Sequence, residues 1–265
     1  MNTKFVMRAL FLPRCVALVA AASAVATSLF GHDLNIRPTL RGTRLEARLS
    51  VNHPDDYAWF DTNRLTGVTL HAPDGKTTTV FPGRFKHEQT ILRLTPDVKC
   101  EQPGVWTLAG GYDNGFWVEA KDGREVNATL QDVPDAKSSG HYRKMGKGLV
   151  QVGAAATGFD RVVGMRVELV PVENPFAAKV GGTLPVRVLF DGKPVADAGL
   201  EIGDGVTVMK EEKIPRYKSD ANGIARVPIA RRGWQHIIVD YTVPNSGNAF
   251  AEKEVISSAL VFQLK

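Results

Sequence analysis

The sequence predicts an all-β protein with two antiparallel β-sandwich domains of the immunoglobulin type, which follow a cleaved signal peptide. Apolar and polar residues alternate in short runs, the period of a half-buried strand, and the clearest run is 183–190, TLPVRVLF. Turn signals separate such runs at Asp191-Gly192 and Asn222-Gly223, because glycine accepts the positive φ that tight hairpin turns need. There is no alternation of strands with long helices, and the GxxxxGK[ST], GxSxG and HExxH motifs are absent.

Residues 1–31 have the layout of a secretory signal peptide. Lys4 and Arg8 give a positive start, and the apolar, small-residue run VALVAAASAVATSLF follows at 16–30. Two cleavage points stay open, before Thr27 and before His32. The apolar run is short and lacks a stop-transfer pattern, so we expect a periplasmic protein that is not an integral membrane protein.

Residues 32–119 are predicted to form the N-terminal sandwich. Five alternating runs, each bounded by turn residues, predict its strands: 44–51, 68–72, 77–81, 90–95 and 103–110. The last run, PGVWTLAG, is typical of a strand that closes an immunoglobulin-like sandwich, with Trp106 in the core.

Residues 120–164 are predicted to connect the two sandwiches. Tyr142, Met145 and Leu149 fall at helical spacing and indicate a weak helix. The neighbouring positive residues Lys137, Arg143, Lys144 and Lys147 are expected on a solvated face. Strand patterns return at 149–152 and 165–172, and residues 165–265 are predicted to form the C-terminal sandwich, with further strands at 224–229 and 233–241.

Charge and cysteine content argue against some classes of function. The whole chain has a formal charge of +5, but loss of the signal peptide would leave 30 basic and 28 acidic residues, which predicts no nucleic-acid partner. Loss of Cys15 in the same segment would leave Cys100 alone, so no intrachain disulfide is expected. We expect Cys100 to be a partly buried structural thiol.

The run HYRKMGKGLVQVG at 141–153 begins a resemblance that continues through 165–202, 217–242 and 257–264. These segments resemble a bacterial family of exported proteins of unassigned function, usually described as the periplasmic component of nickel or cobalt uptake systems. The resemblance covers most of residues 32–265 and implies an N-terminal sandwich joined to an immunoglobulin- or transthyretin-like one.

Two short motifs near the start of the mature chain also match that family. Gly31-His32-Asp33-Leu34 corresponds to a histidine directly after the signal peptide, and Val51-Asn52-His53-Pro54 to a His-Pro pair that closes the next strand. Asn35 and Asn52 stand where family members usually have Trp and Gly. The resemblance implies a divalent metal, nickel or cobalt, and a membrane metal transporter as partner.

The chemistry that would support a metal site is concrete. Cleavage before His32 would let its α-amino group and imidazole chelate one divalent ion, with His53 as a second imidazole and Asp33, Asp55 or Asp56 as a carboxylate. Such a nitrogen-rich, thiol-poor set suits nickel, cobalt, copper and zinc. Binding would weaken in acid as imidazoles and amine take up protons. The alternative stays open that His32 is a loose terminus and His53 a turn residue.

Two further classes of function remain. A non-catalytic adaptor at the cell envelope would bind protein or glycan through exposed aromatic residues, for which the candidates are Tyr57, Trp59, Phe60, Phe116 and Trp117. A copper oxygenase would also pair an N-terminal histidine with a second histidine on a β-sandwich. Nothing else in the chain resembles such an enzyme, and no spacing brings a hydrolytic triad together. We therefore expect a non-catalytic protein.

Overall fold

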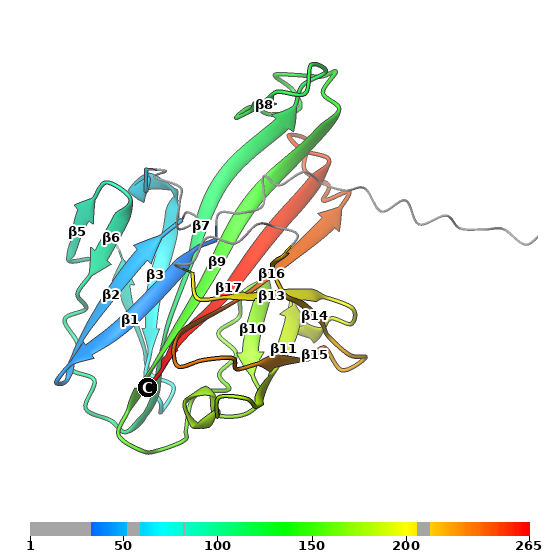
Figure 1. The fold of residues 1–265 in the computed structure, drawn as a ribbon. Helices are drawn as coiled ribbons and strands as arrows, with labels where there is room; N and C mark the ends of the chain where they lie inside the picture. Colours follow the sequence, from blue (N-terminus) through cyan, green and yellow to red (C-terminus); the bar gives the residue numbers. More distant parts are fainter. Residues whose placement is uncertain (1–32, 52–58, 82, 206–212) are drawn as a thin grey trace, which may run out of the picture.

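The computed structural model describes residues 33–51, 59–81, 83–205 and 213–265, and it confirms the all-β class. The helical elements of this described part are two short 3₁₀ turns, η1 (Thr62–Arg64) and η2 (Pro175–Ala177). The remaining regular structure consists of strands in three sheets (Figure 1).

A nine-stranded sheet runs through the molecule in the order β14-β13-β16-β17-β9-β7-β3-β4, with β8 paired to β7. In chain order its strands are β3 (Leu65–His71), β4 (Thr77–Phe81), β7 (Gly104–Glu119), β8 (Glu125–Val126), β9 (Ser138–Val152), β13 (Gly199–Gly203), β14 (Arg216–Lys218), β16 (Gly233–Pro244) and β17 (Lys253–Leu264). We call it the central sheet.

Two four-stranded sheets accompany the central sheet. The first has the order β1-β2-β6-β5, with β1 (Asn35–Arg41), β2 (Arg44–Ser50), β5 (Phe85–Glu88) and β6 (Ile91–Leu94). The second contains β10 (Val167–Pro171), β11 (Thr183–Phe190), β12 (Lys193–Pro194) and β15 (Ile224–Pro228). The predicted turn after β11 is present, since Asp191 and Gly192 both have positive φ.

The two smaller sheets pack on opposite faces of the central sheet. On β7, Trp106 belongs to the core shared with β1, β2 and β6, whereas its neighbour Val105 belongs to the core shared with β10, β11 and β15. On β9, Val150 and Leu149 divide in the same way. Because successive side chains of a strand point to opposite faces, one sheet separates two hydrophobic cores. The central sheet takes strands from all three predicted segments, and the division into two domains stays a prediction.

Two expectations about the middle of the chain are wrong. The helical spacing over 142–149 falls inside strand β9, and β9 pairs with β17 in parallel, so the central sheet is mixed and not purely antiparallel. The expected solvated face is also absent for two lysines, because Lys144 and Lys147 are buried on opposite faces of β9. A strand covered on both faces loses the apolar–polar alternation that identifies half-buried strands.

Glycines in β9 let strand β1 lie directly on the central sheet. A Cβ at Gly146 would lie 2.5 Å from the carbonyl oxygen of Leu34, and a Cβ at Gly148 would clash with the carbonyl oxygen of Ile36. No side chain could occupy either position without moving β1. The start of the described chain is therefore fixed against the middle of the molecule.

Candidate functional site

Among the predicted metal ligands, Asp33 is the one that the structure describes; His32, His53 and Asp55 lie outside the described residues. Asp33 is 7% exposed and accepts a hydrogen bond from the Ser257 hydroxyl on β17. The candidate site is therefore built outward from this contact.

Ser257 is the middle of a polar row that crosses three strands of the central sheet. It pairs with Asp240 of β16 on one side and with Lys144 of β9 on the other. Residues directly opposite each other in a sheet share a face, so the three side chains lie next to one another and Asp33 reaches them from the first smaller sheet.

The charges in this row are two carboxylates and one ammonium. Lys144 is 1% exposed, whereas the side chain of Asp240 reaches solvent. Dense protein surroundings remove part of the hydration of Asp240, and with the negative charge of Asp33 they raise the pKa of Asp240 to about 7. The positive charge of Lys144 and a hydrogen bond with Ser257 oppose this shift. A deprotonated Asp240 would leave the row with net negative charge, which favours cations nearby.

Ser257 and Lys144 are also the residue types that act as nucleophile and base in Ser–Lys hydrolases. Both are only 1% exposed, and the Ser257 hydroxyl donates to Asp33. A substrate therefore has no access to the hydroxyl in this arrangement, and the row is suited to holding the chain in place.

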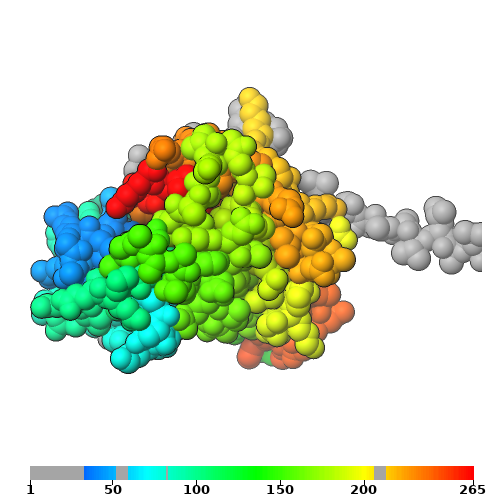
Figure 2. Space-filling model, turned by 90° about the horizontal axis from the view of Figure 1, so that it is seen from below, coloured from blue at the N-terminus to red at the C-terminus, as the bar shows by residue number. Residues whose placement is uncertain are grey.

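A buried charge pair, which the sequence did not indicate, lies on the opposite face of β9. The Lys147 ammonium donates to Glu168 of β10 and, at 3.0 Å, to the carbonyl oxygen of Arg161. The Glu168 carboxylate also accepts three backbone N–H groups of residues 163–165 at 2.7–3.1 Å. Arg161 in turn donates to the carbonyl oxygen of Pro73. The loop after β9 thus has hydrogen bonds to both halves of the chain. In Figure 2 the middle of the chain, which contains this loop and is coloured green, lies between the blue N-terminal part and the orange part.

His71 on β3 is held between two hydroxyl groups. Its ring nitrogens lie 2.9 Å from the Thr69 hydroxyl and 3.1 Å from the Thr77 hydroxyl. Burial lowers the pKa of His71, and the positive charges of Arg161 and Lys147 lower it further. The ring is therefore neutral near pH 7, with both nitrogens in structural contacts.

The other described histidines are also placed in structural contacts. His141 lies 2.9 Å from a carboxylate oxygen of Asp113, His87 contacts a backbone carbonyl at 3.2 Å, and His236 is buried in β16. No three His, Cys, Asp or Glu residues of the described part are grouped as they would be around a metal ion.

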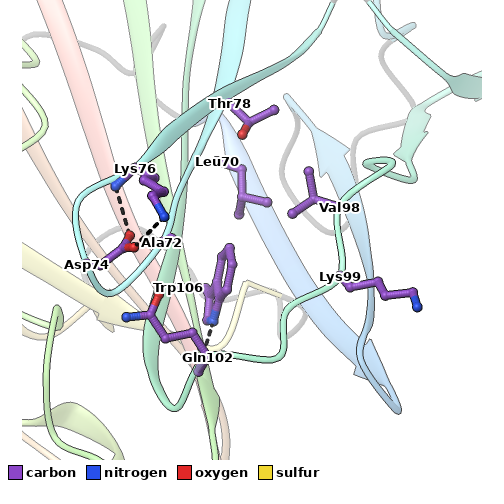
Figure 3. A pocket seen from close by; sticks show the side chains of 9 residues that line it. All are labelled: Leu70, Ala72, Asp74, Lys76, Thr78, Val98, Lys99, Gln102 and Trp106. Carbon is purple, nitrogen blue, oxygen red and sulfur yellow. Dashed lines mark hydrogen bonds and ion pairs between the residues drawn. The ribbon is translucent and has the colours of Figure 1, made fainter.

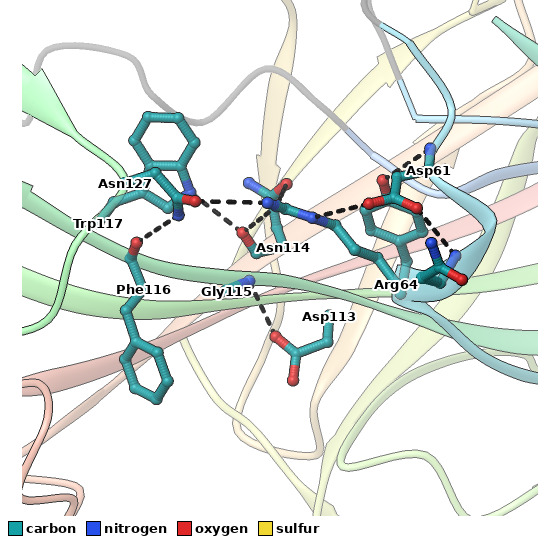
Figure 4. Close-up of polar contacts among 10 residues, drawn as sticks. Asp61, Arg64, Asp113, Asn114, Gly115, Phe116, Trp117 and Asn127 are labelled. Carbon is teal, nitrogen blue, oxygen red and sulfur yellow. Dashed lines mark hydrogen bonds and ion pairs between the residues drawn. The ribbon is translucent and has the colours of Figure 1, made fainter. Parts of the chain in front are cut away.

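A polar network braces the long β7–β9 hairpin at its β-bulge (Figure 4). The Arg64 guanidinium donates to the backbone carbonyl of Asn114 at 2.6 Å and to the Asn127 side chain at 3.4 Å, and it lies 3.6 Å from the Asp61 carboxylate. The Asp61 backbone N–H donates to the hydroxyl of Tyr112. The polar groups in this network bind other groups of the protein, which indicates a structural function.

A small open pocket lies between the β3–β4 hairpin and the segment that leads into β7 (Figure 3). Its volume is about 220 Å³, its floor is apolar, and Lys99 points away from it. Lys76 lies against Asp74 at 3.3 Å, so no free charge faces the cavity. The lining residues are Leu70, Ala72, Asp74, Lys76, Thr78, Val98, Lys99, Gln102 and Trp106.

The predicted aromatic contact residues divide into different environments. Trp59 is 64% exposed, but Phe60 is 1% exposed and belongs to the core, so it is not available on the surface. Phe116 and Trp117 are half-buried on β7, and Tyr57 lies outside the described residues. Phe85 on the edge strand β5 is 45% exposed and was missed, because a short polar run, FKHE, gives no contact signal.

Comparison with known proteins places the chain in a family. Residues 29–243 match the family described as Domain of unknown function (DUF4198). The chain belongs to the DUF4198 family. This agrees with the predicted resemblance to a family of unassigned function over most of the chain. No curated protein matches the sequence.

Among solved structures, the Bacillus anthracis TIE protein is similar over 88% of this DUF4198 chain and 39% of its own chain. The two are 10% identical and superpose with a TM-score of 0.16, a value too low to support any argument about fold or function. Within the described part of this DUF4198 chain, no helix has the length and apolar character needed to cross a membrane.

Proposed function

We propose that the mature protein is an exported, non-catalytic metal-binding protein that holds a divalent ion through His32 and His53 and serves nickel or cobalt uptake. In this proposal the signal peptide directs it to the periplasm, and a membrane metal transporter is its partner. Copper and zinc are alternative ions, because the donor set is rich in nitrogen and lacks thiolate.

The register of β1 and β2 gives the main support. Asn35 pairs with Ser50, Ile36 with Leu49, and the ladder continues without a shift to Arg41. Asn35 and Ser50 therefore stand at the same end of this strand pair, and the candidate ligands His32 and His53 are each three residues away from them along the chain. Both candidates thus flank one end of the same pair in the sequence, which supports a shared site.

The covalent chemistry at residue 32 gives a second argument. Cleavage before His32 would free an α-amino group on the residue that carries the first imidazole, so one residue would supply two nitrogen ligands. The described neighbour Asp33 is held by a hydrogen bond from Ser257. An ordered backbone at Asp33 supports the proposal, because less conformational freedom then remains to be lost when an ion binds next to it.

The test is native intact-mass spectrometry of the protein purified from its exported fraction. We expect a chain that begins at His32 and carries one divalent ion, and we expect the ion to be lost in the double variant His32→Ala, His53→Ala. His87→Ala is the matched control, because His87 on β5 contacts a backbone carbonyl and is not one of the proposed ligands. A chain beginning at Thr27 that takes up no nickel, cobalt or copper would refute the proposal, as would unchanged affinity in the double variant.

A second candidate is a non-catalytic adaptor that binds protein or glycan at the cell envelope. It is favoured by the exposure of Trp59 and Phe85 near the edge of the first smaller sheet. Replacing both by alanine would then abolish capture of envelope components in a pull-down, and the wild type would take up no metal in a titration. Unchanged capture in that variant, together with nickel binding by the wild type, would favour the metal-binding function.

A further inference from the structure

The first described residues of the chain enter the fold under two independent restraints. The backbone of Leu34 and Ile36 rests on the glycines of β9, where a side chain would not fit. One residue earlier, the Asp33 carboxylate is buried and accepts the Ser257 hydroxyl hydrogen bond. The glycines determine how close β1 lies to the central sheet, and the hydrogen bond fixes the position of Asp33 against β17.

Ser257 lies between two groups of opposite charge. Its neighbours across the sheet, Asp240 and Lys144, place a negative and a positive group on either side of the hydroxyl. Lys144 is almost fully buried, so its positive charge is weakly screened and favours a carboxylate nearby. The positive charge of Lys144 therefore favours the Asp33 carboxylate at Ser257, whereas the negative charge of Asp240 opposes it, so the hydrogen bond from Ser257 is the contact that seats Asp33.

We infer that Ser257 is a positioning residue that seats Asp33, so that Asp33 anchors the start of the mature chain and is not itself a metal ligand. The statement about the metal rests on the proposed function; the statement about the anchor does not. Asp33 is the first described residue, so this contact fixes the point at which the described chain enters the fold.

Hydrogen exchange of the metal-free mature protein tests the anchor. Ser257→Ala removes the hydroxyl, and exchange of the backbone amides at 34–37 is expected to rise about tenfold to a hundredfold, because a hydrogen bond to a charged group is lost. Ser257→Thr keeps a hydroxyl and restores protection. Ser258→Ala is the matched control, since Ser258 is equally buried but lies on the other face of β17. Equal exchange in the Ser257→Ala and Ser258→Ala variants would overturn the inference.

A nickel titration of the same variants separates an anchor from a ligand. If Asp33 is an anchor, Ser257→Ala and Asp33→Asn both weaken binding about 10–100-fold and leave the ligand-field spectrum and stoichiometry unchanged. A changed spectrum in Asp33→Asn, with Ser257→Ala like the wild type, would make Asp33 a ligand and overturn the inference. If the wild type binds no nickel while Ser257→Ala still loosens residues 34–37, the proposed function fails and the anchor stands.

Discussion

Replacing Glu168 by glutamine should destabilise the protein severely, because Glu168 neutralises the buried ammonium of Lys147. Both side chains are 2% exposed or less. The carboxylate has no unused side, since it contacts Lys147 and three backbone N–H groups of residues 163–165. Glutamine replaces one carboxylate oxygen by an NH₂ group, which is a donor and would face either the ammonium or a backbone N–H.

The magnitude follows from this arrangement. Breaking a buried ion pair by removing one partner costs about 3–5 kcal/mol, since the remaining charge stays buried. For a protein of this size that corresponds to a fall in Tm of about 6–20 °C. Lys147→Met should cost less than Glu168→Gln, because the three backbone N–H groups still stabilise the carboxylate.

Thermal and urea unfolding of both single variants and the double variant measures this coupling. The double variant Lys147→Met, Glu168→Gln is expected to be more stable than Glu168→Gln alone, because it no longer contains an unpaired buried ammonium. Asp74→Asn, which removes the surface ion pair with Lys76, is the control and should shift Tm by no more than about 4 °C. A loss below about 1 kcal/mol for Glu168→Gln, or losses that simply add in the double variant, would refute the reasoning.

Three other outcomes follow from buried groups. Burial raises the pKa of Cys100 to about 11, so a thiol reagent at pH 8 should react only after unfolding. The free energy of unfolding should fall as pH rises from about 9 to about 11, because the thiol ionises in the unfolded chain before it ionises in the folded one, and Cys100→Ala should remove this slope. Burial lowers the pKa of His71, so its contribution to stability is present above about pH 6.5 and is lost as pH falls below that value through the lower pKa of the folded state. Urea midpoints of His71→Asn should therefore show a weaker decline between about pH 7 and about pH 5. Gly146→Ala should cost about 1–3 kcal/mol in chemical denaturation, because the new methyl group would meet the carbonyl oxygen of Leu34, whereas Gly199→Ala, with no atom within 4 Å, should not destabilise.

The sequence predicts the strands in which apolar residues recur at every second position. The alternation in 44–51 and 183–190 corresponds to β2 and β11, and the Asp191-Gly192 turn forms as expected. These segments carry a local signal, because period-2 burial and positive-φ glycines are properties of a few neighbouring residues.

The candidate site depends on contacts that no local pattern contains. Asp33 and Ser257 are separated by more than two hundred residues and meet because β1 crosses the sheet at the glycines of β9. The chemistry of the N-terminal histidine could be named from the sequence, but the group that fixes its neighbour could not. A serine in an apolar strand, SSALVFQL, looks like a residue tolerated in a core, and only the pairing of β17 identifies its partners.

The burial of Lys144 and Lys147 shows why charge was misleading in this chain. Lysine is rarely buried unless it is paired, so the run RKMGKGLV indicates a solvated surface. Both lysines lie instead in a strand covered on its two faces, one beside a row of polar groups and the other against Glu168. The two positions are three residues apart and therefore point in opposite directions, one toward each smaller sheet. A single strand thus carries one lysine into each core: Lys147 is paired with Glu168 of β10, and Lys144 lies beside Ser257, which donates a hydrogen bond to Asp33.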